Sequence, residues 1–267
     1  MPEHDTRSEG GRNSMTPSIT HPRQYLAHVL GERGIELPEI PPRCVITYCN
    51  DLIEGATSRH EHEAFDIGIT VATRIHVLST GSGSRFGLVA GRPGAPMAAV
   101  LLEELIELGF SEFMVFGTAG QPTNGRGATG FGQVVLPDRA YVYEGTSAHY
   151  GSENGPVPVS RGPREILARH LREAGIAYVE GPAATTDALY RETPELIGEL
   201  LDLGVRVIDM ELSALLSVAR FRGAELAAVL CVSDVIHQDG TWQVGLASDG
   251  LRRMEDRILP VLMNAAG

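Results

Sequence analysis

Short apolar runs alternate with amphipathic stretches along most of the chain. The β-branched run CVITYC, residues 44–49, predicts a buried strand. RIHVLST and RFGLVAG are joined by Gly81-Ser82-Gly83 and predict a β-hairpin. Four further strands are expected in QVVLPDRAYVY, IAYVEG, VRVIDM and ELAAVLCVSD, and FMVF is expected as a strand that runs into the glycine turn GTAG.

Helices are predicted between the strands, where apolar residues recur at helical spacing. In residues 95–108 the glutamates take the opposite face, and Gly109 stands where a left-handed C-cap ends a helix. Thr193 at the N-cap and Pro194 at the first helical position begin another. The remaining helices are expected at 23–33, 163–174, 212–223 and 248–264.

This alternation predicts an α/β fold. Strands separated by helices favour a single-domain, three-layer α/β/α arrangement with a mixed central sheet covered on both faces. Residues 1–22 are mostly polar and lack periodicity, so they are expected to form a disordered tail, with the domain over 23–267. The sequence contains neither an internal repeat nor an interdomain linker.

Charge and cysteine content narrow the class of protein. The 267 residues include 22 Lys and Arg against 34 Asp and Glu, a net charge of −12, which disfavours binding to nucleic acid or to an anionic membrane. The sequence has no apolar run near the ~20 residues that cross a bilayer, and its start lacks a secretory signal. Cys44, Cys49 and Cys231 are an odd set, typical of buried thiols in a reducing cytoplasm.

Gly117-Thr118-Ala119-Gly120 is the first candidate for chemistry, because ligands of α/β sheets bind at the carboxyl ends of strands. Small residues let a ligand approach the backbone, whose amides can hold an anion or a sugar together with the Thr118 hydroxyl. A tight turn that merely needs glycine is the alternative.

Two carboxylates follow other strands. Glu211 offers two acceptors to the vicinal hydroxyls of a ribose, although the dipole of the following helix alone also explains an acidic residue there. Asp234, after Ser233, follows an apolar strand, where partial burial raises a carboxyl pKa toward that of a general acid. A helix cap or turn is the alternative for Asp234.

Aromatic residues and histidines leave further alternatives open. The stretches EGTSAHY and TTDALYRET carry tyrosines that can stack on a base or simply anchor loops. His60 and His62 in SRHEHEAF look like metal ligands, but their acidic neighbours favour a solvated helix or loop. No metal site is expected.

The order of these motifs carries more information than any one of them. From about Arg43 to the last helix, GRPGAP, GTAG, EGTSAHY, TTDALYRET, DMELSALL and VSD follow one another. In this order the chain resembles the nucleoside phosphorylase family, which includes purine nucleoside and uridine phosphorylases and related nucleosidases. DMELSALL followed by VLCVSD is the most specific part of the resemblance.

The resemblance implies roles for two carboxylate segments. Met210 and Glu211 match the Met-Glu pair that binds ribose, with Glu211 holding the 2′- and 3′-hydroxyls. Asp234, preceded by Ser233, matches the acid that protonates or hydrogen-bonds a purine at N7. Glu211 and Asp234 are therefore the expected catalytic residues.

Other matching positions are implied to bind substrate. Leu189 and Tyr190 match the segment that stacks near base and sugar. Thr118 matches the small hydroxyl that contacts phosphate, and Gly120 in the same loop is expected at the substrate. Arg74 matches an arginine that reaches a neighbouring subunit's phosphate in the hexameric enzymes.

The expected phosphate site departs from the family pattern. Asn50 stands where the family has glycine, and Glu54 and Val115 stand where it has arginines. Each lost charge-assisted hydrogen bond costs about 1.5–3 kcal/mol of phosphate binding. The arginines that could substitute from another direction are Arg85, Arg92, Arg126 and Arg191.

The expected function is phosphorolysis of a nucleoside, with a purine favoured, to free base and ribose 1-phosphate. Phosphate would be the co-substrate, with no further cofactor, in a cytoplasmic homo-oligomer, dimer or hexamer. Hydrolysis by a nucleosidase and binding without catalysis are alternatives, motivated by the missing arginines. Arg191 keeps a pyrimidine substrate open.

Overall fold

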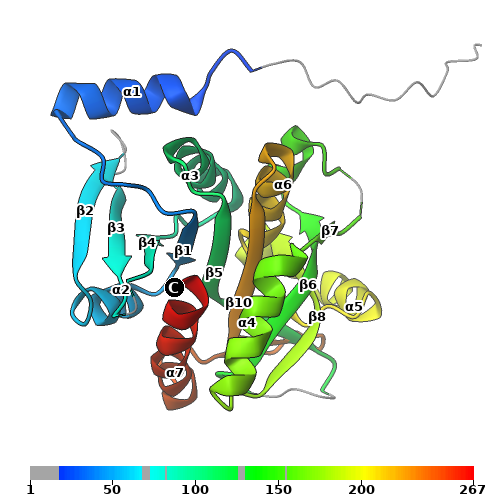
Figure 1. The fold of residues 1–267 in the computed structure, drawn as a ribbon. Helices are drawn as coiled ribbons and strands as arrows, with labels where there is room; N and C mark the ends of the chain where they lie inside the picture. Colours follow the sequence, from blue (N-terminus) through cyan, green and yellow to red (C-terminus); the bar gives the residue numbers. More distant parts are fainter. Residues whose placement is uncertain (1–17, 68–72, 82, 126–129, 154) are drawn as a thin grey trace, which may run out of the picture.

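A computed structural model describes residues 18–67, 73–81, 83–125, 130–153 and 155–267 (Figure 1). Most of the tail expected at 1–22 therefore lies outside the described residues. Pro22, its last residue, opens the first helix, α1 (Pro22–Arg33).

Eleven described strands form one mixed sheet, in the order β11-β10-β6-β8-β9-β5-β1-β4-β3-β2, with β7 paired to β6. Their bounds are β1 (Arg43–Thr47), β2 (His62–Ile67), β3 (Thr73–Ser79), β4 (Arg85–Ala90), β5 (Glu112–Thr123), β6 (Val134–Tyr143), β7 (Val157–Pro158), β8 (Tyr178–Thr186), β9 (Val207–Asp209), β10 (Glu225–His237) and β11 (Trp242–Val244). Strand β10 also pairs in parallel with β5. The strands β5, β9, β8, β6 and β10 therefore close into a circuit, which an open sheet would not form.

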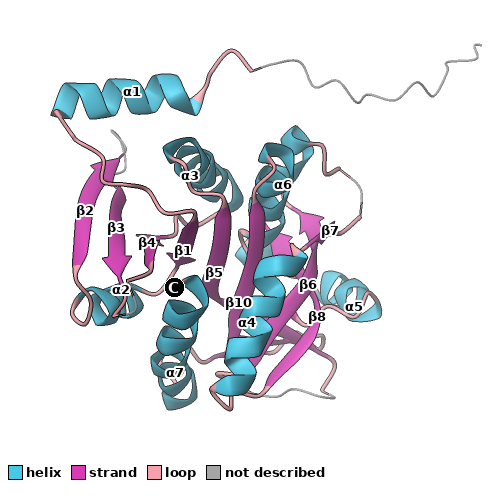
Figure 2. Cartoon of the chain, in the orientation of Figure 1, coloured by secondary structure: helices cyan, strands magenta, loops and turns pink. Residues whose placement is uncertain are grey.

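Helices cover both faces of this sheet (Figure 2). Besides α1 they are α2 (Asn50–Thr57), α3 (Ala95–Leu108), α4 (Arg161–Glu173), α5 (Pro194–Asp202), α6 (Leu212–Arg222) and α7 (Asp249–Ala266), with short 3₁₀ turns η1 (Ser147–Tyr150) and η2 (Leu189–Arg191). Helices α3 and α6 pack together on one face, and α4 and α7 pack together on the other. The α/β/α layering expected from the sequence is confirmed.

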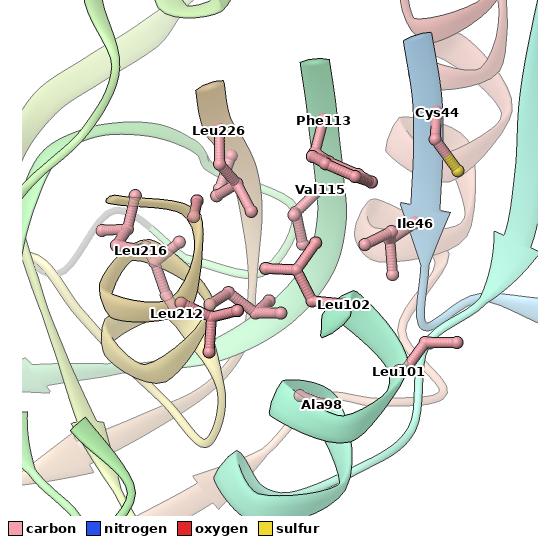
Figure 3. Packing of buried hydrophobic residues seen from close by; sticks show 14 of the residues in the cluster. Cys44, Ile46, Ala98, Leu101, Leu102, Phe113, Val115, Leu212, Leu216 and Leu226 are labelled. Carbon is pink, nitrogen blue, oxygen red and sulfur yellow. The ribbon is translucent and has the colours of Figure 1, made fainter. Parts of the chain in front are cut away.

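Alternation along the central strands builds the two hydrophobic layers. Phe113 and Val115 of β5 point into the cluster that includes Leu102 of α3 and Leu212 of α6 (Figure 3). Phe116, on the other face of β5, belongs to the cluster beneath α4 and α7. Successive strand residues face opposite sides, so one apolar strand serves both layers, and each large side chain contributes about 1.5–3 kcal/mol on burial.

Local signals located several elements correctly. Strands β3 and β4 form the expected hairpin, with Ile75 opposite Val89. Helix α3 has the expected bounds, and Gly109 adopts φ 118° as its left-handed cap. The Thr193 side chain accepts a hydrogen bond from the Leu196 amide at the start of α5, as an N-cap should.

Three expectations were wrong. GTAG is not a turn: β5 continues through Gly117 and Gly120 because β10 pairs with it along this stretch. Asp234 does not end its strand but lies inside β10, next to a register shift after Val232. His62 begins edge strand β2 rather than lying in a helix or loop.

Candidate active site

Gly120 lies between the strand that carries Asp234 and the strand that leads to Glu211. On one side it pairs with Asp234 of β10, and on the other with Ile208 of β9, three residues before Glu211. A methyl group on Gly120 would lie 3.0 Å from Asp234 Oδ2 and 2.6 Å from Ile236 Cδ1. The absence of a side chain at Gly120 therefore leaves room for the Asp234 carboxylate over β5.

The Asp234 carboxylate is buried and receives a donor at each oxygen. The Ser233 hydroxyl lies 2.7 Å from Oδ1, and the Trp242 indole Nε1 donates to Oδ2 at 2.8 Å. Ser233 is thus hydrogen-bonded to its neighbour Asp234. Trp242, on edge strand β11, is a contact that the sequence analysis missed.

Trp242 had a signal in the sequence. Asp239-Gly240 is a dipeptide typical of hairpin turns, and it lies between an apolar strand and Trp242. A hairpin at this turn returns the chain along β10, where Trp242 pairs with Ile236.

Asp209 and Glu211 divide two roles that the sequence could not separate. Asp209 Oδ2 accepts hydrogen bonds from the amides of Glu211 and Leu212, so Asp209 caps helix α6, and its Oδ1 accepts from the Thr185 hydroxyl at 2.6 Å. Burial raises the pKa of Asp209 to about 6. Helix capping therefore does not require Glu211, which keeps one oxygen for another partner.

Glu211 is positioned by the loop before α3. Its Oε1 accepts a hydrogen bond from the Gly94 amide at 2.6 Å. Burial and then the charge of Asp209 raise the pKa of Glu211 to about 7. Met210, between the two acids, is half-buried. The arrangement gives a largely buried carboxyl group with one oxygen bound to the backbone.

Tyr48 lies beside this carboxylate and was also missed. Its ring covers Gly91 and Gly117, where added methyl groups would lie 2.5 Å and 3.4 Å from ring atoms. The hydroxyl is buried, and no described residue hydrogen-bonds it. Burial first, and then the charges of Glu211 and Asp209, raise the pKa of Tyr48, so the hydroxyl stays a donor. A buried phenol beside an acid had no distinguishing signal in the sequence.

A cavity of about 200 Å³ is lined by Leu189 and Tyr190, as well as by Glu192 and Trp242. The rings of Tyr190 and Trp242 meet edge to face, 6.5 Å apart. Since Trp242 binds Asp234, the cavity adjoins the site. Burial and then the charge of Asp234 raise the pKa of Glu192 to about 7. Glu192 is a third residue that the sequence analysis missed.

A larger cavity of about 530 Å³ lies beside the first and shares Pro194 and His237 with it. None of the predicted site residues lines this larger cavity. We therefore assign the base end of the site to the smaller cavity, which neither Asp234 nor Glu211 lines but whose Trp242 binds Asp234.

The predicted phosphate residues are not brought together within one chain. Thr118 lies on β5, half-buried, two residues before Gly120. Arg74 lies on β3, three strand spacings away, or about 14 Å. Arg74 is exposed and pairs with Asp66 at 3.9 Å.

The arginines that could replace the missing phosphate ligands lie in different surroundings. Arg92 is buried, where it hydrogen-bonds Thr73 and Glu104. Arg85 pairs with Glu63 at 2.6 Å. Arg191 is exposed in η2 next to the cavity residues Tyr190 and Glu192, and Arg126 lies outside the described residues.

The three departures from the family pattern also have places in the fold. Asn50 and Glu54 are exposed on α2, so a helix follows β1. Val115 is buried in the core, where its side chain contributes to packing. None of the three side chains supplies positive charge.

Metal-binding groups and membrane helices were sought over the same described ranges. They contain no cluster of three or more His, Cys, Asp or Glu side chains suited to a metal ion. His62 instead stacks on His76, with ring centroids 5.1 Å apart. None of the described helices combines the length and the apolar character needed to span a bilayer.

Comparison with known proteins decides the family. The model of the Phosphorylase superfamily matches residues 45–262. The chain belongs to this superfamily. The order of motifs resembled the nucleoside phosphorylase superfamily, which includes purine nucleoside and uridine phosphorylases. That resemblance is confirmed.

Its relatives include a guanosine phosphorylase of Halorubrum lacusprofundi, 30% identical over 140 residues, which are 52% of this chain and 56% of that protein. A DeoD-type purine nucleoside phosphorylase of Bacillus cereus is 38% identical over 64 residues, 24% of this chain and 27% of that protein. The matches thus span about half and a quarter of these superfamily relatives.

Solved structures support the fold over a longer stretch. Purine nucleoside phosphorylase from Toxoplasma gondii, in complex with immucillin-H, superposes with a TM-score of 0.74 at 19% identity, over 85% of this chain and 91% of that one. Uridine phosphorylase from Vibrio fischeri gives 0.72 at 20% identity, over 85% and 92%. This superfamily member therefore has the phosphorylase fold.

Proposed function

We propose that this chain cleaves the N-glycosidic bond of a purine nucleoside by phosphorolysis, releasing free base and ribose 1-phosphate. The observation that carries the proposal is the placement of two carboxyl groups around Gly120, with Asp234 paired beside it and Glu211 at the end of the strand on its other side. Two acids reached from either side of one strand position suit a ligand with a sugar and a base.

The chemistry assigns one acid to each end of that ligand. Breaking the C1′–N bond develops positive charge on the sugar, while the bonding electrons leave with the base. Glu211, fixed by the Gly94 amide, holds the ribose hydroxyls, and Asp234 lies against the base, at N7 of a purine. Phosphate then attacks C1′ from the opposite face, and fixed positions for the reactants supply much of the acceleration.

The remaining site residues complete this assignment. Leu189 and Tyr190 line the cavity for the base, and Met210 lies beside the sugar. Thr118 contacts phosphate, and Arg74 completes the phosphate site of a neighbouring subunit, because it is too far from Thr118 in its own chain. The protein is then a cytoplasmic homo-oligomer that uses phosphate and no other cofactor.

The choice of a purine is supported by two relatives and one residue. The guanosine phosphorylase and the DeoD-type enzyme are both named for purine substrates. Asp234 suits N7, an atom that pyrimidines lack. The partial coverage of both relatives makes substrate identity part of the proposal.

Hydrolysis is the second candidate, favoured by the charge around the anion position. Glu54 and Asn50 are exposed on α2, Val115 is buried, and none of them can neutralise a dianion. Water as nucleophile needs no such charge.

Product analysis separates the candidates. Inosine, adenosine, guanosine and uridine are incubated with the protein, with and without phosphate, and the products are resolved by reversed-phase chromatography. We expect hypoxanthine or guanine plus ribose 1-phosphate only with phosphate. Free ribose without phosphate supports the hydrolase. Tight binding with no cleavage of any substrate contradicts both and leaves a binding protein.

A further inference from the structure

We propose that Glu144 is a positioning residue for Glu211. Its carboxyl group holds Ser213 in the first turn of helix α6, and Glu211 is the N-cap residue of that helix. The inference rests on the proposed function, in which Glu211 binds ribose. It also gives a role to the EGTSAHY motif, residues 144–150, which the proposed function leaves unused.

The Glu144 carboxyl group organises its own segment and joins that segment to α6. The backbone amides of Thr146 and Ser147 both donate hydrogen bonds to it. The Ser213 hydroxyl donates to Oε1 at 2.9 Å. A carboxylate can only accept hydrogen bonds and has room for about four, so one side chain can satisfy all of these donors. The group that shapes the loop after β6 is therefore the same group that binds the start of α6.

The rest of the motif follows the same side of α6. The buried hydroxyls of Ser147 and Ser217 lie 3.0 Å apart, and the rings of Tyr150 and Phe221 pack edge to face, with centroids 5.5 Å apart. Ser213, Ser217 and Phe221 are spaced four residues apart, which places them on one side of the helix. Tyr150 therefore anchors a loop, which is one of the two roles that the sequence left open for it.

The first turn of α6 is held by side chains from other strands. The Ser213 amide donates to the Thr185 hydroxyl at 2.8 Å, and this hydroxyl in turn donates to Asp209 Oδ1. Asp209 Oδ2 accepts from the Glu211 amide at 3.1 Å. Strands β8 and β9 thus hold the backbone of this turn, and Glu144 holds its one buried hydroxyl. These contacts leave the Glu211 side chain as the part that faces the sugar.

The Glu211 carboxyl group has a fixed partner on another helix. Its Oε1 accepts from the amide of Gly94, the N-cap residue of α3, at 2.6 Å, and α3 packs against α6. Without Glu144, the fully buried Ser213 hydroxyl loses its acceptor and must move toward another. Misplacement of a binding group by about 1 Å can cost ~100-fold in rate. Glu144 therefore acts on the sugar end of the site through Ser213.

The test is a double-mutant cycle between Glu144 and Glu211, measured as kcat/KM on the nucleoside that the unaltered protein cleaves best. We expect Glu144→Ala to lower kcat/KM about 10- to 100-fold, because Glu211 is misplaced. In the Glu211→Ala background the same change should cost less than about threefold, because no carboxyl group is left to position. Losses that multiply fully would show that Glu144 acts elsewhere and would overturn its role.

Ser213→Ala and Ser217→Ala separate positioning from folding. Each variant removes one buried hydroxyl that contacts the motif, so both should lower the melting temperature by similar amounts. Ser217 lies about 6 Å further from Glu211 along the helix. We expect Ser213→Ala to reproduce most of the loss in Glu144→Ala, and Ser217→Ala to lose less than about threefold in kcat/KM. Equal losses of activity would assign the effect to the stability of α6 and overturn the role.

The remaining outcomes distinguish this role from the proposed function. If the unaltered protein cleaves a nucleoside and Glu144→Ala matches it, the role of Glu144 is wrong while the proposed function stands. If Glu144→Ala does not fold, Ser213→Ala takes its place in the cycle, because that variant keeps the carboxyl group and its two amide partners. If the unaltered protein cleaves no nucleoside, both proposals fail.

Discussion

The two ends of the candidate site are built differently. On the sugar side, Glu211 is bound to the Gly94 amide and follows Asp209, which caps α6 with buried hydrogen bonds. On the base side, Tyr190 is 85% and Trp242 48% exposed, on a 3₁₀ turn and a three-residue edge strand. The sugar end belongs to the core, whereas the base end is attached to its rim.

This difference indicates that the fold fixes the sugar end of the site more firmly than the base end. Ribose is common to all nucleosides, so a rigid, desolvated carboxylate can be specialised for it. Bases differ in size and in their polar edges, and side chains at the rim can be exchanged at little cost to the fold. The contrast predicts that sugar-side substitutions change both activity and folding, and base-side substitutions change activity alone.

The largest effect is expected for Glu211→Ala. The variant loses two hydrogen bonds from ribose hydroxyls to a charged acceptor, each worth about 1.5–3 kcal/mol, so kcat/KM should fall about 10²–10⁴-fold. Steady-state kinetics on the best nucleoside measure this loss. A fall of less than tenfold would show that ribose is held elsewhere.

Gly120→Ala should be next. The new methyl group would lie 2.6 Å from Ile236 Cδ1 and 3.0 Å from Asp234 Oδ2, so the carboxylate must move. We expect about 1–3 kcal/mol of destabilisation from overpacking, together with a loss of roughly tenfold or more in kcat/KM. Gly81→Ala is the matched control, because nothing lies within 4 Å of its added methyl group. Denaturant unfolding measures the stability of both variants. Equal losses of stability in Gly120→Ala and Gly81→Ala would contradict the packing argument.

Tyr190→Ala tests the rim. The side chain is mostly exposed and contacts Trp242 through one ring edge. The melting temperature should therefore stay within about 2 °C, because an exposed substitution usually changes stability by less than ~0.5 kcal/mol. KM should rise by about three- to tenfold, since aromatic contacts contribute roughly 0.5–1.5 kcal/mol. A large loss of stability would mean that the rim is part of the core after all.

The smallest effect concerns pH and stability. The folded-state pKa values of Asp209 and Glu211 are raised to about 6 and 7, so the folded protein binds more protons than the unfolded chain above about pH 4. Their contribution to stability is therefore full below about pH 4 and is lost as pH rises to about 7.

Glu211→Gln removes one of these titrations. At pH 8 we expect the variant to melt about 2–4 °C higher than the unaltered protein, the shift that ~1 kcal/mol produces at this size, even though it is less active. Calorimetry at pH 4.5 and pH 8 measures the difference, which should shrink at the lower pH. An equal shift at both pH values would assign the effect to packing.

The sequence predicted the elements whose signals are local. Gly109 and Thr193 mark helix ends through their own backbone and side-chain chemistry, so their assignments did not depend on the rest of the fold. GTAG failed for the opposite reason: its glycines also permit a turn, and only pairing with β10 shows that they lie in a strand. Because β5 and β10 are about a hundred residues apart, no local pattern contains that pairing.

The residues of the candidate site also divide into those with a signal in the sequence and those without one. Asp234 and Glu211 were found because they belong to an ordered set of motifs, and the structure places both around Gly120. Trp242, Glu192 and Tyr48 were missed because their importance comes from a neighbour distant in sequence or from burial. The roles of Asp234 and Glu211 remain predictions, and the Glu211→Ala kinetics above test the second.

The closed circuit of strands has a consequence for local opening of the structure and hence for hydrogen exchange. At Gly120, β5 is paired on both sides, so its amides there should exchange with solvent deuterium only when the whole circuit opens. Trp242 lies on an edge strand paired to β10 alone and can open locally. The hydrogen bond from the indole to Asp234 thus links a strand expected to exchange slowly to an edge strand expected to exchange fast.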